Sequence, residues 1–191
     1  MTIKTDYSRF DIHDELTAPE GSQKILNAVE TGGGEISKFI GVLAGAPAAL
    51  RAFARMRHEL REGTLPSATR ERIALAVAER RGDSYSVAQH AGTARAAGLG
   101  LDEVSRARSF TSADEKEAAL LAFLEGLHDS EERPGAYLAE EAREAGWSDE
   151  ELLEAVAHLA LSEFQTLIAN AAALPQDQID PRILPEAAKA A

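Results

Sequence analysis

The chain has 191 residues, of which 45% are hydrophobic and 5% aromatic, and its formal net charge is −12 at pH 7. This length suits one domain, which buries roughly 70% of the surface that its unfolded chain exposes. The negative charge argues against nucleic acid as a partner, because basic patches drive such binding, and it disfavours an anionic membrane for the same reason. The chain contains no cysteine, which excludes disulfides, thiolate metal sites and thiol catalysis.

The chain is predicted to consist of one helical domain with an extension at each end. The first residues, MTIKTDYSRFDIHDEL, contain no apolar signal core, and no stretch reaches about 18 apolar residues. We therefore expect a cytoplasmic protein without a membrane segment. The predicted parts are an N-terminal arm at 1–20, a helical domain at 21–175 and a C-terminal tail at 176–191.

Apolar residues recur with helical spacing throughout the domain, and alanine is abundant while aromatic residues are scarce, which favours closely packed helices. The predicted fold is all-α, a single-domain bundle of about eight helices. In chain order, the helical patterns lie over 22–30, 35–45, 46–63, 67–82, 83–98, 101–108, 112–130, 133–146 and 148–174.

Several helix ends carry recognisable signals. Ser67 is a predicted N-cap, and Gly98 is placed to end the helix that contains it. Ser148 and Glu151 have the spacing of a capping box, and Pro175 is expected to end the last helix. The consecutive glycines at 32–34 are expected to separate the first two helices, because glycine loses much entropy in a helix.

One helix begins with chemically active side chains on a single face. Asp83, Ser86 and His90 stand at positions i, i+3 and i+7, which share one side of a helix. Glu71 lies on the preceding helix, nineteen residues before His90. A tight turn at Gly82 would make the two helices antiparallel neighbours and would allow Glu71 to contact His90.

The segment RERIALAVAERRGDSYSVAQHAGTARAAGL resembles the core of the carboxymuconolactone decarboxylase and alkyl hydroperoxidase D superfamily. Peroxidases of that superfamily carry a glutamate, eleven residues, and then the pattern C-x-x-C-x-x-x-H. Glu71 and His90 occupy the glutamate and histidine positions, whereas Asp83 and Ser86 stand at the two cysteine positions. The likeness extends over about 39–174. It implies an alkyl hydroperoxidase D-like fold and a homo-oligomer, commonly a trimer or a hexamer.

The resemblance also indicates which reactions the site could and could not catalyse. Peroxidases of the superfamily reduce peroxide through two thiols, while the glutamate and the histidine relay protons. Asp83 cannot form a disulfide, and the hydroxyl of Ser86 is far less acidic than a thiol, so thiol peroxidase activity is excluded. Decarboxylases of the superfamily lack the cysteine pair as well and need no cofactor. We therefore hypothesise that His90 is a general acid/base oriented by Glu71, and that Asp83, Tyr85 and Ser86 contact the substrate.

The predicted substrate is a small carbonyl, lactone or carboxylate compound that undergoes decarboxylation, isomerisation or cyclisation, without a cofactor. A carboxylate would need a cation, and Arg70, Arg72 and Arg80 are the nearest candidates in the sequence. A metal site has little support, because the five histidines are far apart and no H-E-x-x-H pattern occurs. Apolar runs at 73–78 and 156–168 favour a subunit contact.

Two alternatives to this acid/base enzyme remain open. The first is a non-catalytic binding or scaffold member of the superfamily, and the second is a carboxymuconolactone decarboxylase proper. The site residues also have structural explanations: Glu71 suits the first turn of a helix, Asp83 follows a glycine as an N-cap would, and His90 fits a core. A closed apolar pocket in which Glu71 and His90 face each other would favour an enzyme. Asp83 acting as the cap of its helix, together with a pocket filled by side chains, would favour a scaffold.

Overall fold

The structure is a computed structural model that describes residues 8–31, 35–129 and 135–175. All the secondary structure of the described residues is helical, which confirms the all-α prediction, although nine helices are present rather than about eight. The helices are α1 (Glu20–Thr31), α2 (Lys38–Leu43), α3 (Pro47–Arg61), α4 (Ser67–Arg80), α5 (Ser84–Ala96), α6 (Leu101–Ala107), α7 (Glu115–Asp129), α8 (Ala136–Glu144) and α9 (Asp149–Ala172). The predicted glycine break at 32–34 and the tail at 176–191 lie outside the described residues.

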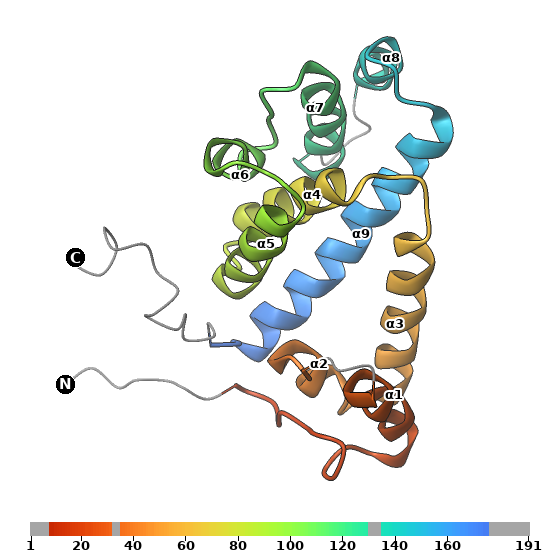
Figure 1. Ribbon diagram of the computed structural model, residues 1–191, viewed down its shortest axis with the longest axis vertical. Coiled ribbons are helices and arrows are strands. Elements are labelled where there is room, and N and C mark those ends of the chain that lie inside the picture. Colours follow the sequence, from red (N-terminus) through yellow and green to blue (C-terminus); the bar gives the residue numbers. More distant parts are fainter. Residues whose placement is uncertain (1–7, 32–34, 130–134, 176–191) are drawn as a thin grey trace, which may run out of the picture.

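The longest helix, α9, runs diagonally through the molecule and has 24 residues (Figure 1). It lies between α3 on one side and the α4–α5 pair on the other, and it contacts all three of these helices. By length and composition alone, α9 could cross a membrane. Its position explains its apolar character instead, since neighbouring helices cover it on several sides.

Helix α4 is apolar nearly all round, and the structure explains why. Every residue from Ile73 to Ala78 is at most 6% exposed, because α5, α6 and α9 all pack against α4. The chain itself therefore covers the 73–78 run, which does not supply an apolar subunit surface. The expected homo-oligomer stays a prediction.

Among the described helix ends, those predicted at Gly98 and Ser148 are confirmed, whereas α9 already ends at Ala172, where Ala173 adopts a positive φ of 51°, before Pro175 is reached. Ser148 Oγ accepts a hydrogen bond from the amide of Glu151, whose carboxylate in turn accepts one from the amide of Ser148, so the capping box is formed. Gly98 follows α5 with a positive φ of 95°. Ser67, however, is the first residue of α4 rather than its cap. The carbonyl of Pro66 already accepts the first helical hydrogen bond, from the amide of Arg70.

A tight turn makes α4 and α5 antiparallel neighbours, as the sequence predicts. Gly82 adopts a positive φ of 64°, a conformation that disfavours residues with a Cβ. The next amide, that of Asp83, donates a 2.9 Å hydrogen bond to the carbonyl of Ala78, which closes the end of α4. The chain then enters α5 directly at Ser84. This short connection fixes which residues of α4 and α5 lie opposite one another.

Candidate functional site

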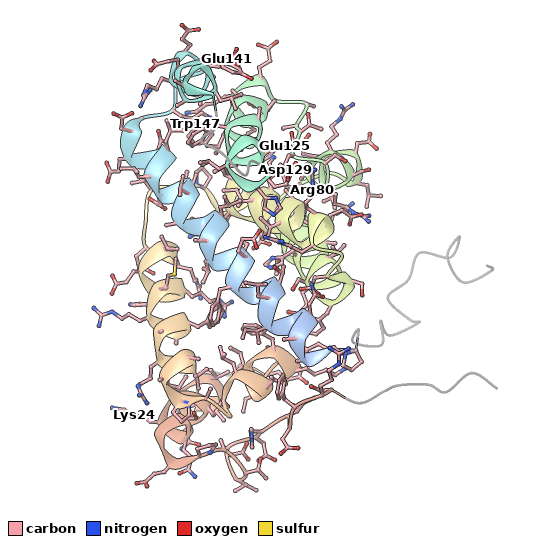
Figure 2. The ribbon with its side chains drawn as sticks, turned by 180° about the vertical axis from the view of Figure 1, so that it is seen from behind. Lys24, Arg80, Glu125, Asp129, Glu141 and Trp147 are labelled. Atoms are coloured by element: carbon pink, nitrogen blue, oxygen red, sulfur yellow. The ribbon has the colours of Figure 1, made fainter. Side chains whose placement is uncertain are left out.

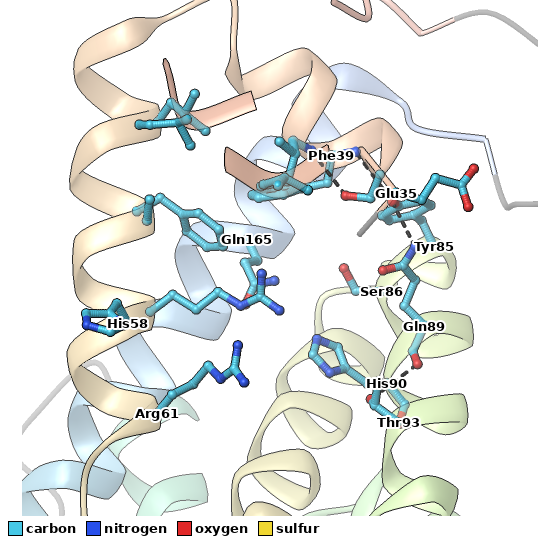
Figure 3. Close-up of a pocket in the computed structure, with 18 of the residues that line it drawn as sticks. Glu35, Phe39, His58, Arg61, Tyr85, Ser86, Gln89, His90, Thr93 and Gln165 are labelled. Atoms are coloured by element: carbon cyan, nitrogen blue, oxygen red, sulfur yellow. Dashed lines mark hydrogen bonds between the residues drawn. The ribbon is translucent and has the colours of Figure 1, made fainter. Parts of the chain in front are cut away.

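A cavity of about 390 Å³ lies between α3 and the α4–α5 pair (Figure 3). Gln165, a polar residue within the apolar helix α9, contributes to its wall. One part of the wall is apolar and comes from α1, α2 and α3: Ile25, Val29, Phe39, Ile40, Leu50, Phe53 and Ala54. The polar part comes mainly from α3, α4 and α5. The volume falls in the range of sites for small organic molecules.

Glu71 and His90 meet in the polar part of this cavity. His90 Nδ1 lies 2.8 Å from Glu71 Oε2, and the two side chains are 21% and 22% exposed. Thr93 Oγ1 donates a second hydrogen bond, of 2.6 Å, to the same carboxylate oxygen. Within the described part of the chain, His90 Nε2 makes no hydrogen bond. It is therefore available to a molecule in the cavity.

The surroundings keep Glu71 ionised. Burial alone would raise the pKa of Glu71, but hydrogen bonds from His90 and Thr93, together with the positive charges of His90 and Arg70, outweigh it. The pKa of Glu71 is therefore lowered from its ordinary value. A carboxylate held against one ring nitrogen of a histidine fixes the orientation of the ring and stabilises its protonated form.

Ser86 and Tyr85 also line the cavity, and both are buried. The side chain of Ser86 is directed into the cavity from the same helix as His90 (Figure 3). The hydroxyl oxygen of Tyr85 accepts hydrogen bonds from Gln89 Nε2 at 3.0 Å and from the amide of Phe39 at 3.4 Å. Tyr85 thereby ties α5 to α2 at the apolar end of the cavity.

Asp83 differs from the other predicted site residues, because it is not among those that line the cavity. Its Oδ1 accepts a hydrogen bond from the amide of Ser86 and caps α5. Its Oδ2 is buried and has no hydrogen-bond partner in the described structure. The capping alternative is thus confirmed for Asp83. The structure brings the remaining four predicted residues, Glu71, Tyr85, Ser86 and His90, to one cavity.

The three arginines suggested by the sequence as partners for a substrate carboxylate are all engaged elsewhere. Arg70 donates to the backbone carbonyls of Leu60 and Arg61. The ion-pair partners of the other two are carboxylates of neighbouring helices: Glu103 and Glu117 for Arg72, and Glu125 and Asp129 for Arg80. Figure 2 shows Arg80 beside Glu125 and Asp129, where α4 meets α7. Neither Arg70, Arg72 nor Arg80 lines the cavity.

Two other arginines, Arg57 and Arg61 of α3, do line the cavity, and the sequence analysis missed them. A signal was present: Leu50, Phe53, Arg57 and Arg61 stand at i, i+3, i+7 and i+11, so the arginines continue the apolar face of the helix. Both arginines are exposed to solvent, so they lie at the open side of the cavity. Basic residues that continue an apolar helix face are thus a signal for a polar site on that face.

His158 of α9 is 7% exposed and is not among the residues that line the cavity. Burial, with the nearby charge of Arg70, lowers the pKa of His158, so the folded protein favours the neutral imidazole. Among the described residues, no group of three or more His, Asp or Glu side chains is arranged to hold a metal ion.

The arrangement of the helices is similar to that of solved alkyl hydroperoxidase D-like proteins. The protein therefore has the alkyl hydroperoxidase D-like fold. Residues 47–126 match the model of the carboxymuconolactone decarboxylase family. This range contains both Glu71 and His90, so the resemblance indicated by the sequence motif is confirmed. No curated protein matches the chain in sequence.

Solved structures of similar fold cover most of the chain. An uncharacterized peroxidase-related protein from Ralstonia eutropha JMP134 is 21% identical with a TM-score of 0.74, over 90% of this chain and 93% of that one. Another uncharacterized peroxidase-related protein, from Silicibacter sp. TM1040, is 18% identical with a TM-score of 0.76, over 93% of this chain and 96% of that one. A protein of unknown function from Agrobacterium tumefaciens is 18% identical with a TM-score of 0.62, over 70% and 94%. These similarities establish the fold.

Asp83→Ala is expected to destabilise the protein by about 0.5–2 kcal/mol, because it removes the N-cap of α5. Asp83→Asn keeps an oxygen at the capping position and is expected to change stability much less, since Oδ2 has no partner to lose. Urea unfolding of both variants measures the difference. Equal losses in the two variants would contradict the capping role, because the charge rather than the acceptor would then matter.

Glu71→Gln is expected to lower stability more at pH 7 than at acidic pH. The pKa of Glu71 is lower in the folded protein than its ordinary value of 4.5, so the unfolded chain takes up the proton first as pH falls. The stabilisation is therefore complete above 4.5 and is lost as pH falls through the folded pKa. Urea unfolding of the wild type and the variant from pH 7 downward measures this. A free-energy difference that does not shrink with falling pH would contradict it.

Proposed function

We propose that the protein is an acid/base enzyme that acts on a small carbonyl, lactone or carboxylate compound by decarboxylation, isomerisation or cyclisation, without a cofactor. The observation that carries this proposal is the contact between Glu71 and His90 at 2.8 Å in the wall of a cavity that side chains do not fill. This cavity is open and partly polar, rather than the closed apolar pocket that the sequence led us to expect of an enzyme. A scaffold that had lost its activity would be expected to fill such a cavity with side chains.

In the proposed mechanism, the substrate lies against the free edge of the His90 ring. Nδ1 is held by Glu71, so Nε2 donates a proton to the substrate or removes one from it. Glu71 stays ionised and stabilises the imidazolium that forms when His90 takes up a proton. A positioned acid or base of this kind contributes about 10²–10⁴-fold to the rate.

The other lining groups have supporting roles. Ser86 stands on the same helix as His90 and offers a hydroxyl to a carbonyl or carboxylate oxygen in the cavity. Tyr85 shapes the boundary between the apolar and polar parts through its bonds to Gln89 and the backbone of Phe39. Asp83, which the sequence predicts to contact the substrate, instead caps α5 through its carboxylate.

Chemistry that depends on thiols is excluded for this chain, although two of the similar structures are peroxidase-related proteins. The chain has no cysteine. A serine hydroxyl and an aspartate carboxylate cannot form the disulfide that two-thiol peroxide reduction requires. Acid/base chemistry is what the carboxylate, imidazole and hydroxyl groups of this cavity support.

His90→Ala is expected to lower kcat/KM by about 10²–10⁴-fold, because it removes the group that moves the proton. Glu71→Gln is expected to lower kcat as well, since the ring loses its charged partner. A panel of lactones and β-keto acids, followed by NMR for product formation, first identifies a compound that the wild type converts. The rates of the variants are then measured on that compound.

Glu59→Gln is the matched control for loss of a carboxylate, because Glu59 lies on the solvent side of α3 and pairs with Arg55. Its rate is expected to equal that of the wild type. Turnover by His90→Ala at the wild-type rate would contradict the proposed function. So would a panel in which no compound is converted and none raises the melting temperature of the protein.

A further inference from the structure

We propose that Arg57 and Arg61 form a subsite that binds the carboxylate group of a small molecule with an apolar body, opposite the Glu71–His90 pair. The interpretation of this site as a substrate subsite rests on the proposed function. The interpretation as an anion-binding site depends only on the position of the two arginines on α3. Neither the family match nor the similar structures assign these two residues a role.

Both arginines face the cavity from one side of α3. They stand four residues apart, which places one guanidinium about one helical turn from the other. Arg61 of α3 and His90 of α5 extend toward each other from opposite walls (Figure 3). A molecule bound between them would contact the arginines with one end and the imidazole with the other.

No described acidic side chain pairs directly with either arginine, although the charge of Glu71 in the same cavity acts on Arg57 and raises its pKa. Among the described residues, neither Arg57 nor Arg61 forms an ion pair or a side-chain hydrogen bond. Two like charges at i and i+4 on a helix repel one another and destabilise it. Acidic side chains are plentiful in this chain, with 32 Asp and Glu against 20 Lys and Arg, so the lack of a partner at this position is not explained by scarcity.

The contrast with Arg55 on the same helix shows what an ordinary surface arginine does here. Arg55 lies on the opposite side of α3 and is 80% exposed, and its Nε donates a 2.9 Å hydrogen bond to Glu59. Arg57 is also exposed, but it lines the cavity, where partial desolvation and the nearby charge of Arg61 lower its pKa while the charge of Glu71 raises it. An anion in the cavity would offset both of these costs.

The two parts of the cavity wall define the class of ligand. The planar guanidinium group binds a planar carboxylate through two parallel hydrogen bonds. The apolar wall includes Phe39 and Phe53, whose rings pack edge to face with centroids 5.1 Å apart and offer an apolar surface to the body of a ligand. Glu35 also lines the cavity, but beside Phe39 and Tyr85 and away from Arg61 (Figure 3). The ligand that fits is therefore a carboxylate carried on a small apolar or cyclic body.

The test compares benzoate with benzamide, its uncharged counterpart of nearly the same shape. Titration of each compound into the full-length protein, followed by NMR of the histidine and arginine side chains, gives the dissociation constants. The variants are Arg57→Gln, Arg61→Gln and the matched control Arg55→Gln. Inorganic phosphate is titrated separately, to distinguish a carboxylate subsite from a phosphate subsite.

The expected result is that benzoate binds the wild type and Arg55→Gln equally well, and binds each cavity variant about tenfold more weakly. Benzamide is expected to bind all four proteins weakly. The melting temperatures of Arg57→Gln and Arg61→Gln are expected to equal or exceed that of the wild type, because repulsion is relieved and no partner is lost.

Three results would overturn the proposal. The first is equal binding of benzoate to the wild type and the cavity variants, and the second is tighter binding of phosphate than of benzoate. The third is a lower melting temperature or a smaller sedimenting species for the cavity variants, which would assign the arginines to the fold or to a subunit contact. Arg57→Lys, which keeps the charge, is expected to bind benzoate with intermediate affinity.

These outcomes are separable from the fate of the proposed function. Weakened benzoate binding in Arg57→Gln, together with full turnover by His90→Ala, would retain the anion site and reject the acid/base role. Unchanged benzoate binding, together with loss of turnover in His90→Ala, would reject the arginine subsite alone.

Discussion

The packing of α4 against α5 is the constraint on which the rest of this structure depends. The buried run Ile73–Ala78 holds α4 in the interior, and the turn at Gly82 sends α5 back along it. These two features set the register of the pair, so that Glu71 and His90, nineteen residues apart in sequence, lie 2.8 Å apart in space. A shift of one residue in either helix would turn one of the two side chains to another face.

Two positions near the start of α5 have different roles in this structure. Asp83 and Ser86 stand at the two cysteine positions of the motif that the sequence resembles, and Asp83 is a helix cap whereas Ser86 lines the cavity. The position nearer the turn therefore has a structural role. The position one turn further along α5 lies beside the histidine. What the cavity offers to a ligand is consequently a set of oxygen and nitrogen groups.

Much of the fold and part of the site could be predicted from the sequence, because both depend on local patterns. Helical periodicity, the capping box at Ser148 and the glycine turn all act within a few residues. The contact of Glu71 with His90 followed once the turn was recognised. Arg57 and Arg61 were missed although they continue the apolar face of α3, because this local pattern does not show which residues lie opposite them across the cavity. Arg72 was wrongly considered as a partner for a substrate carboxylate, because its two carboxylate partners lie on helices that are remote in the sequence.

The most direct measurement of the central claim is a double-mutant cycle on kcat/KM for Glu71 and His90. If the two side chains act as one acid/base unit, the variant that combines Glu71→Gln with His90→Ala loses no more activity than His90→Ala alone. If the two losses multiply, the residues act independently, and the account of a single carboxylate–imidazole unit is wrong.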